Sequence, residues 1–160
     1  MRKGIDVKHI NPFLQASISV VESAAQMKLA VGKPMIHNFE FKEMTYTIQV
    51  GVTGAMRGQV VLAMPMEQAK EIASKMMYGM PVNELDEMAC SALSELSNMI
   101  MGNTATVFST QGILIDITPP MAVLGSNIKI KSDIEGLKVP LLYEGKEYIG
   151  LHICVFEDDQ

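Results

Sequence analysis

Three polar residues in the middle of the chain have the spacing that places side chains next to one another on a helix. Ser91, Glu95 and Asn98 are four and three positions apart, and residues so spaced are neighbours on a helical surface. A carboxylate in such a row can pair with a partner's lysine or arginine, and a carboxamide can orient a water molecule. The row lacks a nucleophile activated by a base, because no histidine is near in sequence and Ser91 has no evident activator. The residues alone predict either positioning chemistry or a solvated helix face.

The helix that presents this row is predicted from Glu84 to about Thr110, with Asn83 as its N-cap and a possible bend at Gly102-Asn103. At about 100° per residue, the core face comprises Leu85, Met88, Ala89, Ala92, Leu93, Leu96, Met99 and Ile100. A polar stripe beside it comprises Glu84, Ser91, Glu95, Asn98 and Gly102. Because Gly102 leaves the backbone uncovered, we expect a partner to approach closely there. Ser91, Glu84 and Gly102 are therefore candidate partner-binding residues.

The remaining segments switch between helical and strand periodicity. Two further helices are predicted, one from Asn11 to Leu29 with Asn11 as its cap and one after Pro65 that Gly79 ends. Strands are predicted as an antiparallel meander at Phe39–Phe41, Tyr46–Val52 and Gln59–Met64, then at Ile113–Thr118, Ile128–Ile134, Leu137–Tyr143 and Tyr148–Glu157. Hairpin turns are predicted at Asp133–Gly136 and Glu144–Lys146. This order favours an α+β fold with a largely antiparallel sheet and three helices packed on one face.

Composition limits the class of protein. The 160 residues are about one domain's worth, so one domain over 1–160 is expected. A net charge of −5 without a Lys/Arg run longer than two residues argues against nucleic-acid binding. The uncharged run from Leu96 to Ile115 carries too many polar residues for a membrane span. Cys90 and Cys154 form no Cys-x-x-Cys pair and the three histidines are scattered, so no metal site and a reducing, cytoplasmic compartment are expected.

Methionine is unusually frequent, with 14 residues in the chain. Most of them are expected to fill gaps in the core. Met77, Met80 and Met101 are not on a core face and are the candidates for a partner surface.

The polar row resembles a family signature. Ser91-x-x-x-Glu95-x-x-Asn98, followed twenty residues later by Pro119-Pro120, is similar to the motif of the CheC/CheX/FliY phosphatases of bacterial chemotaxis. The segments Ser91–Met99, Asp116–Pro120 and Lys129–Ser132 resemble the CheX-like members in particular. The order of segments agrees along nearly the whole chain.

The resemblance implies a phosphatase that acts on the phosphorylated response regulator CheY. Glu95 is expected to contact a lysine of the regulator, and Asn98 is expected to align a water molecule for in-line attack on phosphorus. The resemblance also implies that the protein needs no cofactor of its own, because the aspartyl phosphate and its Mg²⁺ are expected to belong to the regulator's receiver domain. In CheC-type relatives the motif occurs twice, but here Glu22 is followed by Ala25 where an asparagine is needed, so one site per chain is expected.

Two questions stay open at the level of sequence. The same fold occurs in flagellar-switch adaptors, so a non-catalytic module that binds a receiver or a switch partner is the alternative function. The resemblance also implies a homodimer joined through the sheets. In the strand predicted at Tyr148–Glu157, the residues that would point to either face of the sheet are mostly apolar. This strand is therefore expected to be buried on both faces or used at an interface.

Overall fold

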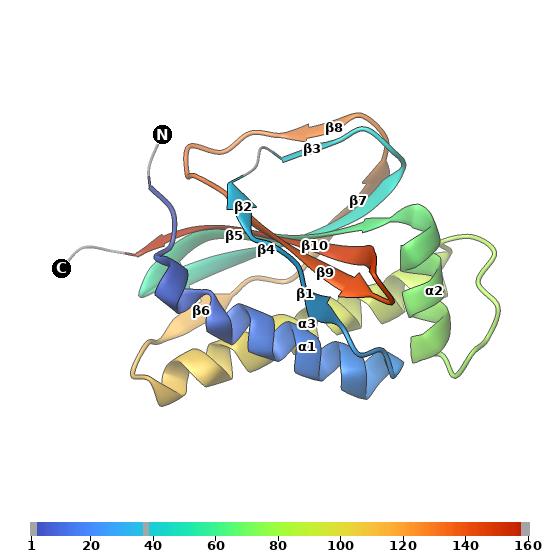
Figure 1. Cartoon of the computed structure of the whole chain (residues 1–160), viewed down its shortest axis with the longest axis horizontal. Coiled ribbons are helices and arrows are strands. Elements are labelled where there is room, and N and C mark those ends of the chain that lie inside the picture. Colours follow the sequence, from blue (N-terminus) through green and yellow to red (C-terminus); the bar gives the residue numbers. More distant parts are fainter. Residues whose placement is uncertain (1–2, 37–38, 158–160) are drawn as a thin grey trace.

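The computed structural model describes residues 3–36 and 39–157, with helices on one side of a large sheet (Figure 1). Its helices are a short 3-10 helix η1 (Val7–His9), α1 (Asn11–Ala25), α2 (Met66–Met76) and α3 (Glu87–Thr110). Its strands are β1 (Ala30–Val31), β2 (Met35–Ile36), β3 (Phe39–Phe41), β4 (Thr45–Gly54), β5 (Met56–Pro65), β6 (Ile115–Ile117), β7 (Met121–Gly125), β8 (Ile128–Ile130), β9 (Leu137–Tyr143) and β10 (Lys146–Glu157).

The main sheet is antiparallel throughout its described pairs. Its strand order is β1-β9-β10-β5-β4-β6, with β2 also on β9 and β7 also on β4. The predicted α+β class, antiparallel sheet and helical layer are confirmed (Figure 1). The predicted turn at Glu144–Lys146 joins β9 to β10, and both Glu144 (φ 51°) and Gly145 (φ 82°) have the positive φ that a tight hairpin of this kind requires.

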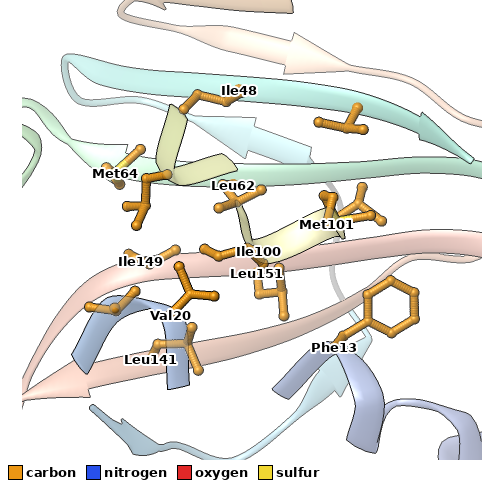
Figure 2. Close-up of a cluster of buried hydrophobic side chains, with 14 of the residues drawn as sticks. Phe13, Val20, Ile48, Leu62, Met64, Ile100, Met101, Leu141, Ile149 and Leu151 are labelled. Atoms are coloured by element: carbon orange, nitrogen blue, oxygen red, sulfur yellow. The ribbon is translucent and has the colours of Figure 1, made fainter. Parts of the chain in front are cut away.

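One cluster of buried apolar side chains joins the helices to the sheet. Figure 2 shows side chains from α1, α3, β4, β5, β9 and β10 pointing toward one another, among them Phe13, Ile48, Leu62, Ile100 and Leu151. Phe13 of α1 and Phe108 of α3 pack edge to face with ring centroids 5.4 Å apart. Helix α3 therefore packs on the sheet with one side and on α1 with another, which fixes the orientation of its remaining face.

Two helix boundaries differ from those predicted. Helix α1 ends at Ala25, not Leu29, because Gln26 adopts a left-handed conformation (φ 53°) and the chain then turns Met27 and Leu29 into the core. Asn11 also provides no side-chain cap for α1. Helix α3 begins at Glu87 rather than Glu84, because Asp86 is its N-cap.

Several strand predictions were wrong in pairing or in length. Strand β3 pairs with β8 and not with β4, so the predicted three-strand meander is only the β4–β5 hairpin. The residues from Asp133 to Gly136 consequently connect two different sheets and do not form a hairpin turn. Strands β6 and β8 are three residues each and shorter than predicted, and β1, β2 and β7 were not predicted.

Strand β10 is buried on both faces, as predicted, and the protein's own fold accounts for this. On one face Ile149, Leu151 and Ile153 enter the main core. On the other face the rings of Phe39 and Phe41 lie 5.1 and 5.2 Å from the ring of His152. The two-stranded sheet formed by β3 and β8, here called the arm, therefore covers the second face of β10. Among the described residues, the helices are all too short or too polar to cross a membrane.

Candidate functional site on helix α3

The start of α3 is set by an aspartate cap. Asp86 has extended backbone geometry, and its Oδ1 accepts a hydrogen bond of 2.9 Å from the backbone N–H of Ala89. Asn83, three residues earlier, was predicted to do this and does not. From Glu87 the helix runs without interruption through Gly102 to Thr110, so the row of polar residues stands on one continuous rigid element.

The structure brings the predicted row together on the exposed side of α3. Ser91, Glu95 and Asn98 are all exposed, while Leu93 and Leu96 between them are buried. Within the described part of the chain, neither the Glu95 carboxylate nor the Asn98 carboxamide makes an ion pair or hydrogen bond with another side chain. Both groups are thus available to a partner, and they stand on a convex helix face.

The buried side of the same helical turn is tied to the sheet by Tyr46 of β4. Its hydroxyl lies near the side chains of Cys90 and Ser94, one residue before and three residues after Ser91. Burial first, and then the Cys90 contact, raise the pKa of the Tyr46 phenol above its usual value, so it is protonated at neutral pH. Tyr46 is 3% exposed, and it anchors the turn that carries the row. Sequence reasoning missed this contact, because the strand pattern predicts the face of the sheet on which Tyr46 lies but not the residues that pack there.

Gly102 extends the row by one turn and leaves the surface open. A Cβ placed on Gly102 meets no atom within 4 Å. Its backbone is helical, so this glycine is not required by local geometry. The prediction that Gly102 exposes backbone at the end of the row is therefore confirmed in its geometry, and its role in binding stays a prediction.

Glu84 does not belong to the row. It lies in the bend that precedes Asp86, outside the helix, so the stripe calculated for it does not apply. Its predicted place on the polar stripe was wrong because the cap is at Asp86, three residues later than assumed.

Two methionines of α3 have the opposite environments to those predicted. Met88 was assigned to the core face and is 59% exposed, whereas Met101 was assigned to a partner surface and is fully buried. Met101 is buried because α1 packs on α3 and adds a second covered side to the helix. In the α2–α3 region, Met77 packs partly against the core, while Met80 is exposed.

Two cavities of the described structure lie away from this row. One of about 520 Å³ is beneath the arm and is lined by residues that include Ile36, Phe39, Lys129, Lys131 and Ile134. A shallow groove follows the exposed face of α1. Among the described residues there is no group of three histidine, cysteine or carboxylate side chains able to hold a metal ion.

Helix α1 offers no second copy of the row. Glu22 is exposed, but Ala25 is buried and is the last residue of the helix. An asparagine at position 25 would point into the core and could not reach a partner. The expectation of one row per chain follows from this geometry as well as from the sequence.

The fold is that of the CheC-like superfamily. The structure overlays on a CheC-like superfamily protein from a Shewanella species with a TM-score of 0.82, at 28% identity, covering 94% of this chain and 99% of that one. It overlays on the Borrelia burgdorferi complex described as CheX-CheY-BeF3-Mg+2 with a TM-score of 0.80, at 30% identity, covering 95% of this chain and 100% of that one.

Sequence comparison identifies the family within this superfamily. The family model described as "Chemotaxis phosphatase CheX" matches residues 46–148. A Thermotoga maritima protein named CheY-P phosphatase CheX is 33% identical over 152 residues, which covers 94% of this chain and 97% of that relative. The chain belongs to the CheX family of chemotaxis phosphatases.

Proposed function

We propose that this protein is a phosphatase that hydrolyses the aspartyl phosphate of a CheY-like response-regulator receiver domain. The T. maritima relative is named for this activity, and the B. burgdorferi relative is described in complex with CheY. The observation that carries the proposal is the pair formed by Glu95 and Asn98, exposed, without intramolecular partners and on one continuous helix.

The two residues have different roles in this proposal. Glu95 pairs with a lysine of the receiver and fixes the orientation of docking. Asn98 then enters the receiver's active site and orients the attacking water in line with the phosphorus–oxygen bond. A carboxamide is a poor base, so its contribution is orientation and not proton abstraction. Phosphoryl transfer depends mainly on positioning and charge stabilisation, which is what a rigid helix can supply.

The metal belongs to the partner in this scheme. The receiver holds Mg²⁺ beside its phosphorylated aspartate and neutralises the charge on the phosphoryl oxygens. This chain contributes side chains only, and we expect it to need no cofactor of its own. Ser91 lies one turn before Glu95 and Gly102 one turn after Asn98, so both are proposed to lie within the contact surface.

The decisive measurement compares wild type with Asn98→Ala on a phosphorylated CheY-type receiver. Wild type is expected to accelerate phosphate release over the receiver's own decay. Asn98→Ala is expected to lose about 100-fold or more of this acceleration, as for other groups that position a reacting atom, and to bind a beryllofluoride-activated receiver normally. A non-catalytic adaptor, the alternative function, would bind the receiver and leave its decay unchanged.

We further propose a homodimer in the cytoplasm. The two cysteines are free, as expected in a reducing compartment. Support for dimerisation comes from β7, an edge strand that pairs only with β4 among the described strands and exposes Met121, Val123 and Leu124. An exposed apolar edge strand is a surface that natural proteins normally cover.

A further inference from the structure

Met88 stands out among the exposed residues of α3. The helix is described along its whole length, and Met88 is the one large hydrophobic residue exposed on it, at 59%. It takes no part in the buried apolar cluster. Leu85, before it in the chain, and Met99, later in the same helix, do pack against that cluster. Single exposed hydrophobic residues are common and mean little alone, so its position decides the matter.

Met88 lies in line with the row that faces the receiver. It precedes Glu95 by seven residues, which is two helical turns with an offset of about 20° and a rise of about 10.5 Å. Ser91 lies between them as a neighbour of both. Met88, Ser91, Glu95 and Asn98 therefore form one exposed strip along the helix, which carries a thioether, a hydroxyl, a carboxylate and a carboxamide in this order.

The arrangement of this strip is that of a small protein interface. Such interfaces combine an apolar anchor with polar groups that fix register, and methionine adapts well to a partner because its side chain is unbranched and polarisable. Met88 does not support the core, so its apolar end is available to a partner.

We propose that Met88 is a docking residue for the receiver domain, packing on an apolar patch at the rim of the receiver's phosphorylation site. The proposal rests on the function proposed above and extends its contact surface toward the start of α3. Asn98 is ten residues further on, a rise of about 15 Å, so Met88 is remote from the reacting phosphorus. Its contribution is to binding and not to the chemical step.

The test uses variants that change polarity but not helix formation. Met88→Gln keeps the length and helix propensity of methionine and removes its apolar end, and Met88→Leu keeps an apolar side chain. Met35→Gln is the matched control, since Met35 is 43% exposed on β2, away from α3. Steady-state hydrolysis of a phosphorylated CheY-type receiver gives KM and kcat, and circular dichroism melting checks the fold.

For Met88→Gln we expect KM to rise at least about fivefold with kcat within about twofold of wild type, as for the loss of a binding contact. Met88→Leu and Met35→Gln should keep the wild-type KM. An active wild type with an unchanged KM in Met88→Gln overturns the docking role alone, as does a fall in kcat without a change in KM. A wild type that does not accelerate hydrolysis overturns the proposed function, and the docking role with it.

Discussion

At the scale of single residues, the site separates docking from water orientation. Glu95 and Asn98 are neighbours on one helix, yet only Asn98 is proposed to act on the attacking water. A helix that holds both groups without intramolecular partners has little to reorganise when it meets the receiver. The two roles should therefore separate cleanly in kinetics.

Glu95→Gln tests the charged contact. It removes the charge and keeps the shape, and we expect KM to rise about tenfold, corresponding to about 1.4 kcal/mol. The KM of wild type should increase with salt, because salt screens a charge pair, and the KM of the variant should depend on salt much less. Glu40→Gln, which changes an exposed carboxylate on the arm, should retain both the KM and the salt dependence. Equal salt dependence in wild type and Glu95→Gln would contradict the proposed ion pair.

A second residue-scale prediction concerns alkaline stability and is independent of activity. The Tyr148 hydroxyl donates a hydrogen bond to Glu71, and this bond, followed by burial, raises the pKa of Tyr148 to about 12. The unfolded chain loses this proton near pH 10, about two units earlier. The contribution of Tyr148 to folding is therefore complete below about pH 10 and is lost as the pH rises through about 12.

Tyr148→Phe should accordingly show a weaker decline of melting temperature above pH 10 than wild type, measured by circular dichroism. Some decline should persist, because burial also raises the pKa of Tyr46. Tyr78→Phe, at a fully exposed tyrosine, should follow wild type. A Tyr148→Phe curve that parallels the wild-type curve above pH 10 would count against the role of the Glu71 bond.

At the scale of elements, α3 keeps a glycine where alanine would make a more stable helix. A methyl group on Gly102 meets no atom within 4 Å, so Gly102→Ala should stabilise the protein by about 0.5–1 kcal/mol. The same methyl group should obstruct a closely approaching receiver and raise KM. Asn103→Ala, next along the helix and exposed on another side, should keep the wild-type KM. Higher stability with an unchanged KM in Gly102→Ala would show that the receiver does not approach there.

The sequence predicted the local geometry of α3 well and its surroundings poorly. The separations between Ser91, Glu95 and Asn98 depend only on the pitch of one helix, so their common exposed face was predicted correctly. Whether Met88 or Met101 is covered depends on where α1 and the sheet lie. The start of the helix was ambiguous because Asn83 and Asp86 are both good caps, and only the hydrogen bond to Ala89 distinguishes them.

Strand pairing shows the same limit over a longer range. Alternation predicted a strand at Phe39–Phe41, but its partner β8 lies far along the sequence, and no local signal indicates that pairing. The arm that results covers His152 on β10, which is why that strand is apolar on both faces. A strand that is apolar on both faces in the sequence can thus be covered either by another part of its own chain or by a partner subunit, and the sequence pattern does not distinguish the two.

At the scale of the whole molecule, the strand first suspected as an interface is unavailable. Strand β10 is hydrogen-bonded to β5 on one edge and β9 on the other, and both of its faces are covered. Strand β7, which pairs with β4 (Figure 1), instead exposes Met121, Val123 and Leu124. A second chain that docks there would continue the sheet and leave the exposed face of α3 free for a receiver.

The proposed dimer can be tested without disturbing the phosphatase. Wild type should have twice the chain mass of 17.5 kDa at micromolar concentration by light scattering. Val123→Lys should shift it to a monomer, because Val123 is 53% exposed on the β7 edge and lysine is unfavourable between paired edges. Leu114→Lys, at 71% exposure outside β7, should remain dimeric. Since Glu95 and Asn98 come from one chain, the Val123→Lys monomer should keep the kcat of wild type. A monomeric wild type, or a Val123→Lys variant that stays dimeric, would show that β7 is not the interface.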